Sequence, residues 1–201
     1  MISIIDYDAG NIKSVEKAIL HLGQEAVITR DRDVILSSEK VILPGVGSFG
    51  DAMSKLRDYG LINVIYDVAE KGIPFLGICL GLQLLFESSE ESPGVSGLGL
   101  LKGKILRIPD QEGLKIPHMG WNNLKIKEGA TLFRGIEENP YVYFVLSYYL
   151  KAEDEKDVAA TTTYSTLIHA SVEHENIFAC QFHPEKSSDT GLKILNNFIS
   201  L

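Results

Sequence analysis

The sequence predicts one α/β domain with a doubly wound first half and a β-rich second half that extends the same sheet. Apolar runs rich in β-branched residues alternate with amphipathic segments up to about residue 88. Beyond residue 100 short β-type runs dominate. A length of 201 residues suffices for one buried core and is short for two. Residues 1–201 are therefore expected to form a single domain.

The first half is expected to contain βαβ units. Strands are predicted at residues 2–7, 25–30, 39–45 and 73–78, and helices at residues 11–23, 49–60, 61–72 and 80–88. Strands that alternate with helices in this way run parallel within one sheet. The junction between the strand at 73–78 and the next helix lies at Cys79.

The second half begins after a polar, glycine-rich loop at residues 88–99, whose acidic part, SSEESPG, is expected to be only a surface loop. Strands are predicted at residues 102–108, 121–127, 141–150, 157–164 and 177–182, and a closing helix at 190–201. The charged run at 151–157 is expected to be a solvated turn between strands.

Composition excludes several classes of protein. The chain has 19 Lys and Arg against 27 Asp and Glu, a net charge of -8, so no basic surface for a nucleic acid is expected. The N-terminus reaches Asp6 and Asp8 at once, unlike a signal peptide, and the longest apolar stretch is broken by Pro, Gly and Gln. We expect a cytoplasmic protein without a membrane span, whose two cysteines are free thiols.

Cys79 lies between Gly77 and Gly81 in the stretch GICLG, at a predicted strand-to-helix turn. In a parallel α/β sheet ligands bind at the carboxyl ends of the strands. The G-x-C-x-G pattern has the form of a nucleophile elbow, in which small flanking residues let strand and helix approach closely. A helix N-terminus also favours the thiolate over the thiol. The alternative is a buried structural thiol, because free cysteine packs as a small hydrophobe.

A reactive thiol needs a base, and the segment HPEKS supplies one after the last predicted strand. His183 can take and return a proton, and Glu185 can orient its ring. The backbone N–H of Leu80 is one donor for an oxyanion, and the turn at Gly45 and Val46 can supply a second. That turn could instead be only a glycine-rich connection. His118, His169 and His174 are scattered, so no metal site is predicted.

Four stretches, PGVGSFG, GICLGLQLLFE, PHMGWN and QFHPEKS, resemble in this order the class I glutamine amidotransferases. Within that family they are similar to the glutaminase subunits of imidazole glycerol phosphate synthases. The resemblance implies a flavodoxin-like fold with a mixed, mostly parallel central sheet flanked by helices. It also implies glutamine as substrate, no cofactor, and a glutamyl thioester on Cys79 with His183 and Glu185 as partners.

The resemblance extends to binding and to a partner. It places Gln83 and Gly47 at the bound glutamine, and Gly45, Val46 and Leu80 at an oxyanion hole that forms when the PGVG peptide reorients. It implies a heterodimer with a (β/α)₈-barrel synthase subunit, which receives the ammonia for histidine biosynthesis. The residues that match its interface or ammonia gate are Asn11, Pro117, Met119, Trp121, Tyr143 and Lys186.

Two positions depart from the family pattern: Asp8 replaces a small residue, and Leu146 replaces a histidine. Trp121, the only tryptophan, suits an interface anchor, although core packing is the alternative. Three other functions stay open: a glutaminase serving another acceptor such as a sugar, a different cysteine hydrolase, and a non-catalytic scaffold. Intact Cys79, His183 and Glu185 speak against the scaffold.

Overall fold

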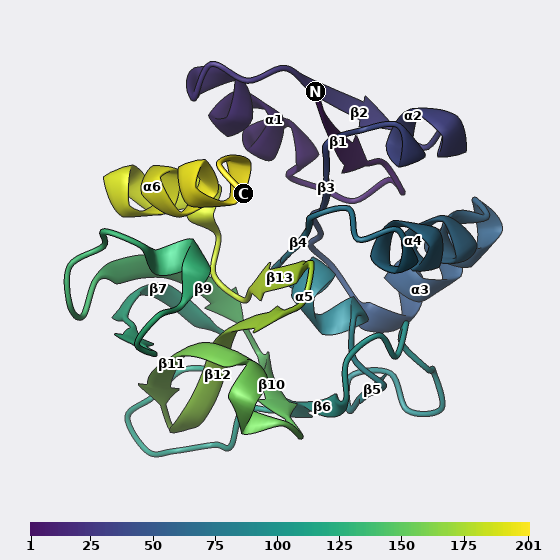
Figure 1. Ribbon diagram of the computed structural model, residues 1–201. Coiled ribbons are helices and arrows are strands. Elements are labelled where there is room, and N and C mark those ends of the chain that lie inside the picture. The colour runs from purple at the N-terminus through teal and green to yellow at the C-terminus, as the bar shows by residue number, and fades with distance from the viewer.

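The central feature of the structure, a computed structural model that describes residues 1–201, is an eight-stranded sheet (Figure 1). Its order is β2-β1-β3-β4-β13-β12-β11-β8. The strands from β2 to β13 in this order run parallel, and the remaining neighbours pair antiparallel. The bounds are β1 Ile2–Ile5, β2 Ala26–Thr29, β3 Lys40–Leu43, β4 Phe75–Ile78, β8 Lys125–Ile126, β11 Val158–Tyr164, β12 Thr166–His174 and β13 Ile177–Cys180.

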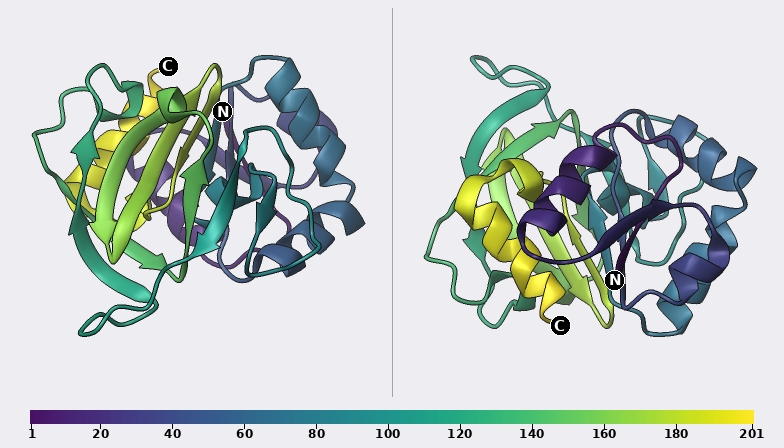
Figure 2. Two further views of the ribbon diagram at one scale, coloured as in Figure 1. Left: turned by 90° about the horizontal axis from the view of Figure 1, so that it is seen from below. Right: turned by 90° about the horizontal axis from the view of Figure 1, so that it is seen from above.

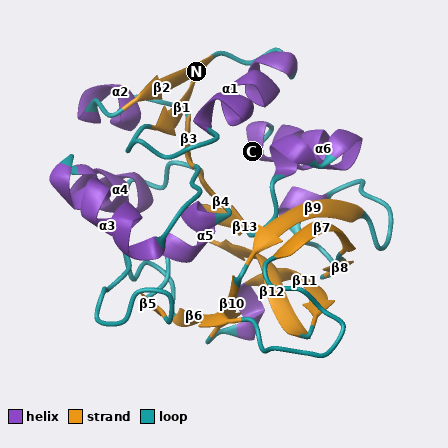
Figure 3. Cartoon of the chain, turned by 180° about the vertical axis from the view of Figure 1, so that it is seen from behind, coloured by secondary structure: helices purple, strands orange, loops and turns teal.

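Helices flank this sheet on both faces (Figure 3). They are α1 Ile12–His21, α2 Arg32–Leu36, α3 Phe49–Asp58, α4 Leu61–Glu70, α5 Leu80–Leu84 and α6 Ser188–Ile199. Three 3₁₀ turns, η1 Thr131–Phe133, η2 Glu155–Asp157 and η3 Pro184–Lys186, complete the helical elements. Two views from opposite sides show α1 and α6 on one side of the sheet and α3 and α4 on the other (Figure 2).

The core has two layers because successive strand residues point to opposite faces of the sheet. In β3, Val41 and Leu43 join one buried cluster with α3 and α4, whereas Ile42 joins a second cluster with α1 and α6. All four residues of β1, β3, β4 and β13 are buried. Strands covered on both faces therefore form the base from which the site projects.

Two smaller sheets flank the carboxyl end of the main one. One has the order β10-β6-β5, from Tyr148–Ala152, Gly103–Arg107 and Ser88–Ser89, and the other pairs β7, His118–Asn123, with β9, Tyr141–Leu146. The expectation that the whole β-rich half extends the main sheet is thus wrong, because only β8, β11, β12 and β13 do so. The fold class itself is confirmed.

Several predicted elements need correction. The run at 141–150 is two strands that separate at Ser147 and join different sheets, and the run at 121–127 is likewise shared between β7 and β8. The helix predicted at 80–88 ends at Leu84. Strand β12 and the short helix α2 have no counterpart among the predicted elements. Residues 153–157 do form an exposed turn between strands, around η2, but residues 151–152 belong to β10 and Ala152 is buried.

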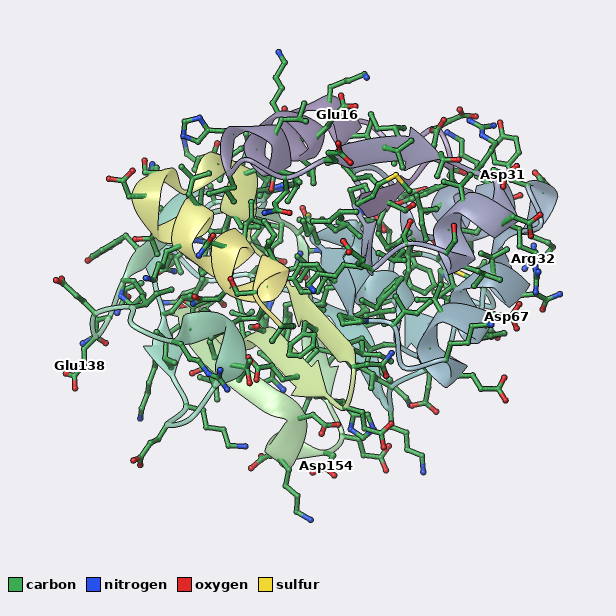
Figure 4. All side chains as sticks on the ribbon, turned by 45° about the horizontal axis from the view of Figure 1, so that its top comes forward. Glu16, Asp31, Arg32, Asp67, Glu138 and Asp154 are labelled. Atoms are coloured by element: carbon green, nitrogen blue, oxygen red, sulfur yellow. The ribbon has the colours of Figure 1, made fainter.

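Charged side chains lie at the periphery. In Figure 4 the labelled Glu16, Glu138 and Asp154 project from the outer elements, and Arg32 of α2 lies beside Asp67 of α4. The Arg32 Nη2 atom is 2.7 Å from an Asp67 carboxylate oxygen, so this ion pair joins the two helices. Exposed pairs of this kind contribute little stability. No helix is both long and apolar enough to span a bilayer.

Candidate active site

Cys79 occupies a strained turn between β4 and α5. Its φ of 54° and ψ of -108° are unusual for a residue with a side chain. A Cβ on Gly81 would lie 1.9 Å from the Leu43 carbonyl oxygen, and one on Gly77 would lie 2.9 Å from the Gly81 oxygen. Only glycine therefore fits at either flank. The turn holds the sulfur at the carboxyl end of the parallel strands, where ligands bind in such sheets.

His183 comes to the same place because β13 lies beside β4, with Cys180 opposite Ile78. Its Nδ1 atom is 2.8 Å from Glu185 Oε1, and both side chains are almost completely buried. Burial lowers the pKa of His183, but hydrogen bonds to Cys79 and Glu185 and their negative charges outweigh it and raise that pKa well above 6.5. The arrangement thus favours the protonated imidazolium form of His183.

A pocket of about 250 Å³ opens over these groups. Cys79, Leu80, His183, Gln83, Val46 and Gly47 line it, as the sequence predicts for a single site. Glu91, Val145, Leu146, Ser147 and Tyr148 also line it. The expectation that Glu91 belongs to a plain surface loop is therefore wrong. Its Oε2 accepts the Phe49 N–H at 2.9 Å, which holds the carboxylate at the pocket wall.

One of the predicted oxyanion donors, the Leu80 N–H, is not free in this conformation. The Leu80 N–H donates to the Gly45 carbonyl oxygen at 3.3 Å, so a peptide oxygen occupies the donor that an oxyanion would use. The buried Tyr7 hydroxyl donates to the Pro44 carbonyl at 2.7 Å. Burial, and then the charge of Cys79, raise the pKa of Tyr7, so this phenol stays a donor. The turn is held at Pro44 and must change at Gly45 to release Leu80.

Gln83 is buried and both N–H groups of its amide are engaged. Its Nε2 donates to the Tyr148 carbonyl oxygen and to Gln181 Oε1, each at 3.1 Å. The Gln83 Oε1 atom accepts no hydrogen bond within the chain and belongs to a residue of the pocket wall. Gln83 can therefore offer a ligand only an acceptor oxygen. Gln181 is fully buried and was not predicted from the sequence. It directly follows β13, as Cys79 directly follows β4, and the two strands are neighbours in the sheet.

Most of the residues assigned to a partner surface are exposed, and one of them, Pro117, also lines the pocket. Met119 and Trp121 are 64% and 49% exposed, and Trp121 packs edge-on against Tyr143, its neighbour across the β7–β9 pair. Core packing of Trp121 is thus wrong. Pro117 and Lys186 are also exposed. Asn11 is half-buried, and its Nδ2 donates to Glu185 Oε1 at 2.6 Å, so it reaches the candidate triad.

Leu146 and Asp8, the two residues that depart from the family pattern, lie in different surroundings. Leu146 is buried at the pocket wall, opposite His118 across the β7–β9 pair. Asp8 is exposed, has a φ of 60°, and accepts hydrogen bonds from Tyr59 and Arg30. These two donors, Tyr59 first, hold the pKa of Asp8 below its usual value. Asp8 thereby joins the loop before α1 to the C-terminal end of α3.

The sequence profile of the family described as glutamine amidotransferase class-I matches residues 3–201. This chain belongs to that family. The amidotransferase is 47% identical to the imidazole glycerol phosphate synthase subunit HisH of Methanocaldococcus jannaschii over the full length of both chains. It is 50% identical to the subunit of the same name from Moorella thermoacetica, over 98% of this chain and 93% of the relative.

Solved structures share the fold of this amidotransferase at lower sequence identity. A crystal structure of a glutamine amidotransferase superposes with a TM-score of 0.77 at 20% identity, covering 99% of this chain and 97% of the other. The PurLQS structure from Thermotoga maritima gives 0.74 at 22% identity, with the same coverage. These likenesses establish the architecture, and the amidotransferase's own site has to supply the chemistry.

Proposed function

We propose that this amidotransferase is the glutaminase subunit of an imidazole glycerol phosphate synthase. Residues 1–201 would form one domain that hydrolyses glutamine and delivers ammonia to a (β/α)₈-barrel synthase subunit for histidine biosynthesis. The observation that supports it best is the meeting of Cys79, at an elbow, with a buried His183 whose Nδ1 is held by Glu185. The two relatives named above carry this subunit's name, and each aligns with this chain over nearly its whole length.

The pocket suits an amino acid with an amide side chain. Glutamine carries an ammonium group, for which the Glu91 carboxylate and the Gln83 Oε1 acceptor are available at the wall. The amide carbon would then lie against Cys79 Sγ at the inner end. Gly47, with a φ of 107°, lines the entrance without a side chain and leaves room for the ligand.

The chemistry proceeds in two halves. The Cys79 thiolate attacks the side-chain amide carbon, and His183 donates its proton to the nitrogen as the C–N bond breaks, releasing ammonia. Water then attacks the glutamyl thioester while His183 accepts a proton from it, and glutamate leaves as the sulfur regains its charge. Glu185 Oε1 keeps the imidazole oriented throughout, 2.8 Å from Nδ1.

The occupied oxyanion donor supports control by a partner. As long as the Gly45 oxygen takes the Leu80 N–H, a tetrahedral intermediate lacks that hydrogen bond, which in comparable sites is worth roughly 2.7–4 kcal/mol. A synthase subunit docked on Met119, Trp121 and Tyr143 would also cover Pro117, which lines the same pocket as Val46 and Gly47 of this turn, and could there favour the reoriented peptide. Val46 is 40% exposed and could be contacted directly.

The test is glutamate release from glutamine by this chain alone, with a barrel synthase subunit, and with that subunit plus its ribonucleotide ligand. We expect strong release only in the last mixture. Silence in all three, with complex formation demonstrated, would favour the scaffold. Release that no synthase subunit of histidine biosynthesis enhances, but that a sugar-amidating partner does, would assign the ammonia to another acceptor.

A further inference from the structure

Gln181 has not been given a role in the reaction described above, yet its amide contacts the reacting sulfur. Its Nε2 atom is 3.7 Å from Cys79 Sγ, within hydrogen-bonding reach of so large an acceptor. The side chain is fully buried. Strand register explains the contact, because Cys180 of β13 lies opposite Ile78 of β4, so the next residues, Gln181 and Cys79, are neighbours.

An amide can present either its oxygen or its nitrogen to the sulfur, and the surrounding contacts decide which. The Tyr148 backbone carbonyl can only accept, so the Gln83 amide must turn its NH₂ toward it. The same NH₂ has a second hydrogen, which points at Gln181. Gln181 must therefore present its oxygen to Gln83 and its NH₂ to the sulfur.

The direction of this chain of hydrogen bonds matters chemically. It begins at a backbone oxygen that never changes and ends in an N–H aimed at Cys79 Sγ. A thiolate accepts such a bond better than a thiol, because hydrogen bonds with a charged partner are roughly twice as strong as neutral ones. The donor is also fixed in place before the reaction, so no reorganisation is required when charge gathers on sulfur.

We propose that Gln181 is a catalytic residue that stabilises the Cys79 thiolate, and that Gln83 orients it through the fixed Tyr148 carbonyl. This inference rests on the proposed glutaminase chemistry for its purpose. The hydrogen bond to sulfur can nevertheless be tested without glutamine, so the two can fail separately.

The test is the rate of Cys79 alkylation by iodoacetamide between pH 5 and 10, with the modified residue located by mass spectrometry. The groups that face the sulfur, His183 and Tyr7, and the nearby Cys180 and Glu185, stay unchanged in every variant. Gln181→Met keeps the volume and removes the donor. We expect its rate curve to move about one pH unit higher, with a rate about tenfold lower on the acid side of the curve, because the thiolate loses a hydrogen bond that the thiol hardly uses.

A second variant tests the orientation without changing Gln181. In the Gln83→Glu variant the side chain at position 83 has no hydrogen left to donate to Gln181. This holds whether its carboxyl group is ionised or donates its single proton to the Tyr148 carbonyl. The Gln181 amide then turns, and its oxygen faces the sulfur. We expect the alkylation curve of this variant to move to higher pH as well.

Ser171→Ala is the matched control. Ser171 is fully buried on β12, opposite Cys180, and its hydroxyl donates to the Ala179 carbonyl at 2.8 Å, so the variant loses one buried hydrogen bond that does not involve the sulfur. Its alkylation curve should match the unmodified protein. Coincident curves for Gln181→Met and the unmodified protein would overturn the proposal. A shift in Gln181→Met without one in Gln83→Glu would overturn the orienting role of Gln83.

In the complex with a synthase subunit, Gln181→Met should lower kcat for glutaminase while leaving KM within about twofold, because the lost contact is to the nucleophile and not to the ligand. Thermal unfolding of Gln181→Met and Ser171→Ala separates this effect from lost stability. An equal fall in kcat for both variants would indicate a structural role for Gln181 and contradict the proposal.

Discussion

Asn11 Nδ2 and His183 Nδ1 share one acceptor, because both lie within 2.8 Å of Glu185 Oε1. Asn11 lies 174 residues before Glu185 in the sequence and has a φ of 68° at the start of α1. The resemblance to known subunits places Asn11 at the partner surface. In the structure, a residue that is expected to contact the partner therefore forms a direct hydrogen bond to the carboxylate that orients the imidazole.

Asn11→Gly should lower the glutaminase kcat of the complex by roughly 10- to 100-fold, because a hydrogen bond to a charged group contributes about 1.5–3 kcal/mol. Glycine adopts a positive φ without strain, so the loop conformation is retained. Steady-state kinetics of the complex, at saturating partner, measures the effect. Asn11→Asp should be worse than Asn11→Gly, since it places a second carboxylate against Glu185, and the reverse order would contradict this account.

Cys79→Ala and His183→Ala should each abolish glutamine hydrolysis and leave partner binding nearly intact. Both side chains lie inside the pocket, 8% and 2% exposed.

Trp121→Ala provides the opposite control. Its exposed ring should serve as an anchor, so we expect partner affinity to fall by about 2 kcal/mol or more. Isothermal titration with the synthase subunit distinguishes the two classes, and turnover retained by Cys79→Ala would refute the thioester mechanism.

Gly81→Ala should destabilise the protein by about 1–3 kcal/mol, the usual effect of overpacking, because its methyl group would lie 1.9 Å from the Leu43 oxygen. Urea unfolding followed by circular dichroism measures it. Gly50→Ala is the comparison, since its methyl would meet only the Ser92 side chain, with the hydroxyl at 2.9 Å and Cβ at 3.2 Å, and not backbone. Turning that hydroxyl away breaks the hydrogen bond it accepts from the Gly50 N–H, so we expect a loss of only about 1 kcal/mol. Equal stability of the two variants would mean that the elbow tolerates a side chain after all.

Asp8→Gly should melt at a higher temperature than Asp8→Ala. Both variants lose the contacts with Tyr59 and Arg30, but only alanine retains the strain of a φ of 60°. Differential scanning calorimetry compares the two. Asp8→Asn, which tolerates this conformation and keeps an acceptor oxygen, should lie nearest the unmodified protein. Identical melting of the Ala and Gly variants would show that the loop relaxes.

The candidate nucleophile and base were predictable because their signals are local. A thiol between two glycines after an apolar strand, and a His two residues before a Glu, can be recognised in five letters each. Contacts between distant residues gave no such signal. Nothing in the sequence pairs Asn11 with Glu185, and Gln181 acquires its neighbour only when β13 is placed beside β4.

The errors in the β-rich half have a similar cause. Alternation shows which residues of 141–150 form strands but not that β9 pairs with β7 while β10 pairs with β6. Strand β12 was not predicted because the burial of its residues does not alternate. Ala170, Ser171 and Val172 are buried in succession, next to irregular pairing with β11. The local pattern there reflects two covered faces, which only the tertiary fold supplies.

Two imidazoles, the buried His118 and the half-buried His169, give the chain a predictable sensitivity to acid. Burial lowers the pKa of His118 and of His169 below 6.5. At His169 the charge of Glu155 opposes this effect and that of Lys151 adds to it. The unfolded chain therefore binds more protons than the folded one below about pH 6.5. Stability should fall as the pH drops below that value and should not depend on these groups above it.

His118→Phe combined with His169→Asn should flatten this dependence. The phenyl ring can still stack on Tyr164, whose ring centroid lies 3.9 Å from that of His118. The amide oxygen introduced by His169→Asn can accept the Ala152 N–H, which the His169 Nδ1 atom accepts at 3.1 Å. Neither replacement titrates. Urea unfolding at half-unit steps from pH 5 to 8 gives the free energies of unfolding. The curves of the double variant and the unmodified protein should run parallel above pH 6.5 and diverge below it, because only the unmodified protein must then keep two imidazoles uncharged; curves that stay parallel down to pH 5 would place the acid sensitivity in other groups.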